Sequence, residues 1–181
     1  MKRLRLSYTL LSLWEKGEVD KCVSYYLKLP QEETEAMRQG KEWDKKNSES
    51  IEKNKKFIKE FGDWKLQNPK AQLKLEISYN EMLDLVIVPD CVDGDILYEH
   101  KTGKRSATSY LSDRQLGVYA LGLKLSNIPI RQAYLIRFNQ HTGKTDWAKK
   151  IMGDWVFEDA DNYIQTLAPE IHKHFSDINI L

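Results

Sequence analysis

The sequence has few cysteines and no long apolar run. Its two cysteines, Cys22 and Cys91, lie far apart, so neither an iron–sulfur cluster nor a structural zinc site, which needs clustered ligands, is expected. Isolated thiols of this kind indicate a reducing compartment rather than a disulfide. No stretch approaches the roughly 20 apolar residues of a membrane span, and the N-terminus lacks the features of a signal peptide. These absences favour a cytoplasmic protein without a membrane partner.

An excess of charge of one sign is also missing. With 28 basic and 27 acidic residues the net charge is +1, which argues against a protein that coats nucleic acid through bulk positive charge, although local patches stay open. The chain has no internal repeat and no G-x-x-x-x-G-K-[ST] phosphate loop, so a helicase is not expected. An apolar content of 41% and five tryptophans suffice for a core, and the length fits one domain over 1–181.

Hydrophobic periodicity separates a helical part, about 1–65, from a core, about 70–181. Short helices are expected at 7–17 and from 18 to the proline at 30, followed by a long polar helix over 31–61. Alternation then predicts strands at 71–79, 81–89, 94–102, 131–139 and 144–152, with helices at 112–125 and 157–175. This order predicts an α/β fold with a central mixed β-sheet flanked by helices.

Two of the predicted strands carry charged residues. The stretch LDLVIV contains Asp84, and the stretch ILYEHKTGK contains Glu99 and Lys101. The turn-rich PDCVDGD between them predicts an antiparallel hairpin. A turn centred near Val92 places Asp84 opposite Glu99, and a spacing of two puts Glu99 and Lys101 on one face of the sheet. Three charged groups are therefore expected to converge, although burying them is costly unless a partner compensates.

Two explanations of these charges remain open. Carboxylate oxygens suit a hard divalent cation such as Mg²⁺, and the backbone carbonyl of His100 could supply a further oxygen. Lys101 would then orient a nucleophile or stabilise developing negative charge. The alternative is a cross-strand salt bridge in which Asp84 or Glu99 pairs with Lys101.

The helix predicted at 112–125 carries a polar pair. Gln115 and Tyr119 lie at i and i+4, so they share one face, which is expected to adjoin the strand bearing Glu99. An amide and a phenol there can donate hydrogen bonds to phosphate oxygens. The alternative is that Gln115 completes a capping box with Ser112 and that Tyr119 is a core aromatic residue.

An acid also falls on the packed side of the long polar helix. Asp44 shares the apolar stripe with Gly40 and Ile51, and the small glycine would allow close approach to the sheet. Asp44 is thus placed to reach a metal ion held by the acidic strand residues. The alternative is a surface acid paired with a neighbouring lysine.

These stretches resemble a known family. LDLVIV and ILYEHKTGK resemble motifs II and III of the PD-(D/E)xK nuclease superfamily, and RQLGVY resembles the Q-x-x-x-Y motif of its RecB-type branch. That branch includes the RecB and AddB nuclease domains, CRISPR-associated RecB-like exonucleases and phage exonucleases related to lambda exonuclease. LSYTLLSLWEKG resembles the N-terminal helix of the branch, and MRQGKEWDKK its G-x-x-x-H motif. The resemblance extends from about residue 6 to the C-terminal helix.

The resemblance implies a set of roles. Asp84 and Glu99 would bind the metal ion, and Lys101 would have a catalytic role. Gln115 and Tyr119 would contact the substrate or its scissile strand. Two departures stand out. Asp44 occupies the place of the histidine in the G-x-x-x-H motif, where it could still bind a metal ion through oxygen. The cysteines of the iron–sulfur cluster that many CRISPR-associated and AddB-type relatives contain are missing.

The function expected from this combination is a nuclease that depends on Mg²⁺ or Mn²⁺, with a DNA exonuclease as the leading candidate. Lys104, Arg105 and Arg114 flank the site and are expected to contact nucleic acid, with solvated loop charges as the alternative. The partner would be single- or double-stranded DNA, together with other subunits if the chain belongs to a recombination, repair, phage or CRISPR-related complex. The rivals are an endonuclease or junction-resolving enzyme, and a non-catalytic nucleic-acid-binding or assembly module that keeps the fold.

Overall fold

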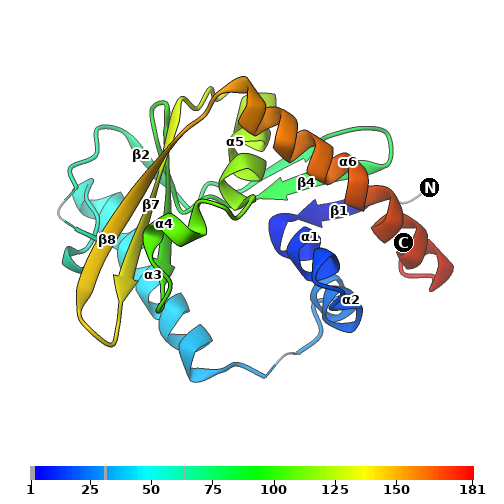
Figure 1. Ribbon diagram of the computed structural model, residues 1–181, viewed down its shortest axis with the longest axis horizontal. Helices are drawn as coiled ribbons and strands as arrows, with labels where there is room; N and C mark the ends of the chain where they lie inside the picture. The colour runs from blue at the N-terminus through cyan, green and yellow to red at the C-terminus, as the bar shows by residue number, and fades with distance from the viewer. Residues whose placement is uncertain (1–2, 31, 63) are drawn as a thin grey trace.

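A computed structural model of the chain describes residues 3–30, 32–62 and 64–181 (Figure 1). The predicted mixed α/β fold with helices flanking the sheet is confirmed, but the strands form two sheets rather than one. A five-stranded sheet has the order β2-β5-β6-β7-β8, and a three-stranded sheet has the order β1-β4-β3. Helix α5 lies between the larger sheet and the group formed by α1, α2 and α6 in the view of Figure 1.

The larger sheet is mixed. Its strands are β2 (Pro69–Ala71), β5 (Cys91–Asp93), β6 (Ile96–Thr102), β7 (Gln132–Asn139) and β8 (Lys144–Ile151). The β6–β7 pair is parallel, whereas β5–β6 and β7–β8 are antiparallel. A parallel pair requires a crossover connection, and here the crossover contains α4 (Ala107–Tyr110) and α5 (Gln115–Leu125). Because α5 lies within this crossover, it packs against β6, the strand that carries Glu99.

The smaller sheet shows that the predicted hairpin is wrong. Its central strand β4 (Leu83–Ile87) pairs with β3 (Leu75–Ser78) and, in parallel, with β1 (Leu4–Ser7), a strand that the sequence did not predict. The hairpin partner of β6 is β5. Two features explain the difference. Pro89 lacks the N–H that a continuing strand would need, and the tight turn lies at Gly94, whose φ of +61° suits glycine.

The helices follow the predicted order with shifted ends. Helix α1 (Tyr8–Glu15) has the predicted N-cap, since the Ser7 hydroxyl accepts the Leu10 N–H at 3.3 Å. Helix α2 covers Val19–Tyr26 and α6 covers Asp154–Asp177. The long polar helix is shorter than predicted: α3 covers Glu35–Asn54 and ends where Lys55 adopts a left-handed conformation, followed by a 3₁₀ turn, η1 (Lys59–Phe61). Among the described residues no helix is both long and apolar enough to cross a membrane.

Two groups of buried side chains lie on either side of β6. The larger group joins α1, α5 and α6 to the smaller sheet, and Gly122 of α5 packs so closely that an added Cβ would lie 2.8 Å from Ile87 Cδ1. The smaller group lies beneath α3 and η1 and consists of Ile51, Phe57, Phe61, Leu66, Cys91, Tyr98 and Ile136. Alternate residues of β6 point to opposite faces, so the strand places polar side chains at the boundary between the two groups.

Candidate active site

Strand β6 brings an acid and an amine together, as predicted. Glu99 and Lys101 lie on the same face, and Lys101 Nζ donates to Glu99 Oε1 at 2.8 Å. Glu99 is only 3% exposed. The predicted salt bridge with Lys101 therefore exists, but it lies within one strand and not across a hairpin. A carboxylate buried this deeply requires more than one polar partner, and the surrounding elements supply them.

The acid opposite Glu99 is Asp90 and not Asp84. The β5–β6 register pairs Cys91 with Tyr98, so continuing it by one residue sets Asp90 against Glu99. Asp90 Oδ2 also accepts the His100 backbone N–H at 2.7 Å. Asp84 lies in the smaller sheet, where Arg3 Nη2 is 2.7 Å from its Oδ1. The pairing on which the assignment of Asp84 rested is thus wrong.

Asp44 approaches these acids from α3. Gly40, one turn earlier, faces Thr102 of β6, and a Cβ at that glycine would lie 3.6 Å from Thr102 Oγ1, so the predicted close approach of helix and sheet is present. Asp44 is exposed, but the protein atoms around it displace part of its hydration. This loss of hydration is the larger cause and repulsion from Asp90 the smaller cause that together raise the pKa of Asp44 to about 6, and attraction to Lys101 opposes the rise. The charges acting on Asp44 are therefore those of the site.

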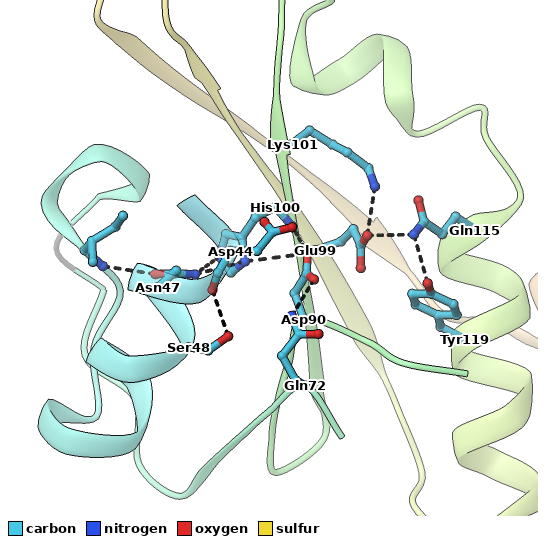
Figure 2. A network of polar contacts seen from close by, with 11 residues as sticks. Asp44, Asn47, Ser48, Gln72, Asp90, Glu99, His100, Lys101, Gln115 and Tyr119 are labelled. Carbon is cyan, nitrogen blue, oxygen red and sulfur yellow. Dashed lines mark hydrogen bonds and ion pairs between the residues drawn. The ribbon is translucent and has the colours of Figure 1, made fainter. Parts of the chain in front are cut away.

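Helix α5 supplies the predicted polar pair. Gln115 Nε2 donates to Glu99 Oε1 at 2.7 Å and to the Tyr119 hydroxyl oxygen at 3.1 Å (Figure 2). The capping-box alternative is wrong, because the helix starts at Gln115 with Arg114 at the N-cap. Burial, followed by the charge of Glu99, raises the pKa of Tyr119 above its ordinary value. The phenol therefore stays protonated and able to donate.

The side chain of His100 points to the opposite face of β6. It lies between the rings of Phe57 and Phe61, with centroid distances of 4.6 and 4.7 Å, and burial lowers its pKa to about 4, so the ring is neutral at neutral pH. Asn47 of α3, a buried residue that the sequence analysis missed, places its Nδ2 3.1 Å from His100 Nδ1. The role predicted for the backbone carbonyl of His100 stays a prediction.

The charge state of the site follows from burial. The pKa of Glu99 is raised to about 8. Loss of hydration is the largest cause and repulsion from Asp90 the second, while Lys101 acts in the opposite direction. Burial disfavours the charged form of Lys101, but attraction to Glu99 and Asp90 outweighs this and its pKa lies above the ordinary value. The site thus keeps its amine positive and holds one carboxyl group close to its titration point.

The donor set fits a hard divalent cation. Glu99 Oε2 is buried and has no hydrogen-bond partner among the described residues, and Asp90 and Asp44 contribute the other carboxylates that act on Glu99. In the part of the chain that the structure describes, no three His, Cys, Asp or Glu side chains form a ready-made metal cage. Mg²⁺ is commonly held by one or two carboxylates, with water and phosphate oxygens completing its shell. Asp90 and Glu99 satisfy this requirement.

The three basic residues predicted to contact nucleic acid have exposed or half-exposed side chains. Lys104 is exposed in the segment after β6. Arg105 Nη2 lies 3.3 Å from Asp113 Oδ1, and Arg114 Nη1 lies 2.9 Å from Glu15 Oε1. Exposed ion pairs of this kind are weak and exchange readily with other anions. A role in binding DNA stays a prediction for all three basic residues.

Comparison with protein-family models finds no match, and comparison with curated proteins finds no relative. Solved structures do resemble the chain. An alkaline exonuclease from Laribacter hongkongensis matches with a TM-score of 0.60 and 9% identity over 97% of this chain and 91% of the exonuclease. The same enzyme in complex with dAMP matches with a TM-score of 0.59 and 10% identity, over 96% of this chain and 90% of the enzyme. The structure of SSO0001 matches with a TM-score of 0.55 and 13% identity, over 92% of this chain and 78% of that chain. At such low identity the likeness shows the fold alone: the chain has a mixed α/β fold similar to that of the alkaline exonuclease.

Proposed function

We propose that the chain is a divalent-metal-dependent nuclease that hydrolyses phosphodiester bonds, and that DNA is cleaved from an end. The observation that carries this proposal is the environment of Glu99. Its carboxylate is buried beside Lys101 and opposite Asp90, and one of its oxygens has no hydrogen-bond partner in the described structure. Most buried carboxylate oxygens in folded proteins have a hydrogen-bond partner, so the free oxygen of Glu99 supports a ligand at this position.

Each residue of the site then has a defined role. Asp90 and Glu99 would hold Mg²⁺ or Mn²⁺, with Asp44 at the edge of the site. When bound, the ion activates water and neutralises charge on the scissile phosphate. Lys101 keeps its proton and stabilises negative charge that develops on the phosphate oxygens.

The pair from α5 completes the arrangement. Gln115 fixes the orientation of the Glu99 carboxylate through its 2.7 Å hydrogen bond. Tyr119, whose hydroxyl oxygen accepts from the same amide, retains an O–H for a phosphate oxygen of the substrate. Both residues would therefore act on the substrate side of β6, opposite the face that holds the His100 ring.

The preference for DNA ends rests on the solved structures with the same fold. Two of them describe an exonuclease, one in complex with dAMP. This mononucleotide is what hydrolysis of a terminal deoxyadenosine linkage releases. The exposed Lys104, together with Arg105 and Arg114, would supply positive charge for binding the DNA backbone.

A matched pair of variants provides the test. Linear DNA labelled at its ends is incubated with the pure protein in Mg²⁺, in Mn²⁺ or in a chelator, and the same DNA with blocked ends is run in parallel. We expect mononucleotide release with either ion, none with chelator and little from blocked ends. Asp90→Asn should abolish cleavage, whereas Asp84→Asn, which only weakens the ion pair with Arg3 in the smaller sheet, should retain it. Cleavage by folded Asp90→Asn at the wild-type rate would contradict the proposal.

A second candidate is a nucleic-acid-binding module without catalysis. It is favoured by the finding that no three His, Cys, Asp or Glu side chains of the described residues form a metal cage. The sequence resemblance adds that Asp44 stands at the position of the family histidine. Calorimetric titration with Mn²⁺ separates the two. The nuclease binds the ion and loses it in Asp90→Asn, while the module binds DNA with or without the ion.

A further inference from the structure

Helix α3 approaches β6 along one stripe of residues. Gly40, Asp44, Asn47 and Ile51 follow at spacings of four, three and four, which places them on a single face of the helix. Gly40 lies against Thr102, Asp44 faces the acids of the site, and Ile51 packs into the smaller buried group. The position of Asp44 therefore depends on how the rest of this stripe is held.

The two residues of α3 that are buried are Asn47 and Ile51. Packing of an isoleucine is non-directional and permits the helix to slide or rotate slightly. Asn47 is 2% exposed and makes directional contacts: Nδ2 lies 3.1 Å from His100 Nδ1, and Oδ1 accepts the Ile58 N–H at 3.0 Å. One amide thus joins the helix to β6 and to the segment that follows α3.

The contact continues to the opposite side of the site. The ring of His100 is in contact with the Asn47 amide. The backbone N–H of His100 donates to Asp90 Oδ2 at 2.7 Å. The rings of Phe57 and Phe61 pack against the imidazole, which is buried, so water competes little for its contact with Asn47. Figure 2 shows the resulting path from Asn47 through His100 to Asp90, with Asp44 one turn away on the same helix.

We propose that Asn47 is a positioning residue that sets the location of Asp44 relative to Asp90, and through Asp44 sets the affinity of the site for a divalent ion. Asn47 touches neither the ion nor DNA, because it lies on the His100 face of β6. This inference rests on the proposed function only in assuming that the acids bind an ion. Residues that orient metal ligands without binding the metal commonly change metal affinity about ten- to hundredfold when removed.

The test is a double-mutant cycle read by calorimetric titration with Mn²⁺. The proteins are the wild type, Asn47→Ala, Asp44→Asn and the double variant. Ile51→Ala is the matched control, since it removes buried apolar contact from the same helix without touching a polar link. Thermal unfolding is recorded for each protein, and titrations are performed well below every unfolding midpoint. If Asn47→Ala does not fold, Asn47→Ser replaces it, because its hydroxyl oxygen can still accept a hydrogen bond.

We expect Asn47→Ala to weaken Mn²⁺ binding by about tenfold or more, Ile51→Ala to leave it close to wild type, and the effect of Asn47→Ala to vanish once Asp44 is already Asn. The KM for DNA should not change. Equal effects of Asn47→Ala and Ile51→Ala would overturn the inference, as would an undiminished loss in the Asp44→Asn background. A wild-type protein that binds Mn²⁺ but cleaves no DNA would overturn the nuclease alone, and one that binds no ion would overturn both.

Discussion

Raising the pH from 7 to 9 is expected to strengthen binding of Mg²⁺ about tenfold. The pKa of Glu99 is about 8 because the carboxyl group is buried beside Asp90. About one tenth of the molecules carry the Glu99 carboxylate at pH 7 and about nine tenths at pH 9, and only the ionised form binds the cation without first losing a proton. Asp44, with a pKa of about 6, is ionised over this whole range. The ionisation of Glu99 alone therefore sets how steeply the affinity for Mg²⁺ depends on pH.

Isothermal calorimetry in buffers of different ionisation enthalpy measures both the affinity and the protons released. Release should approach one proton per ion below pH 8 and fall towards zero at pH 9. Glu99→Gln is the control, because it cannot ionise and should bind weakly with no dependence on pH. An affinity that stays constant from pH 7 to 9, or binding that releases no proton at pH 7, would refute the reasoning.

Three further predictions concern single substitutions. Lys101→Ala should abolish cleavage yet still bind Mg²⁺ at pH 9, and cleavage by the folded variant would remove Lys101 from the mechanism. Gln115→Leu should lower kcat by about tenfold or more, because Glu99 loses a charged hydrogen bond of about 1.5–3 kcal/mol, and a wild-type kcat would contradict this. Gly122→Ala should destabilise the fold by about 1–3 kcal/mol, since the added Cβ would lie 2.8 Å from Ile87. Denaturant unfolding measures the free energy of unfolding, and an unchanged value would contradict the close packing.

The parts of the site that the sequence predicted correctly depend on local periodicity. Glu99 and Lys101 share a face because they are two apart on a strand, and Gln115 and Tyr119 share one because they are four apart on a helix. These spacings do not depend on where the elements lie. The adjacency of the two faces followed from the crossover between parallel strands, which the alternation of strand and helix indicates.

The error over Asp84 arose where the argument depended on long-range register. The prediction treats the two charged strands as a single hairpin with its turn near Val92. The dipeptide Asp93-Gly94 was the better signal, since such pairs mark tight hairpin turns, and a turn there places Asp90 opposite Glu99.

Other features could not be read from the sequence. Strand β1 consists of four residues and is stabilised by pairing with β4, a partner far along the chain. Local pattern contains no information about such a partner. Asn47 was missed for a different reason: asparagine on a polar helix is ordinary, and its burial becomes visible only when His100 is placed against it.

The pairing of β1 with β4 has a consequence for how the protein is made. Leu4 pairs with Leu83, so during synthesis β1 emerges well before the strand that will hydrogen-bond to it. Until then its N–H and C=O groups and the apolar side chains of Leu4 and Leu6 are open to other chains. Completion of the smaller sheet must therefore come late, and slow translation through β4 would prolong the interval in which nascent chains can aggregate.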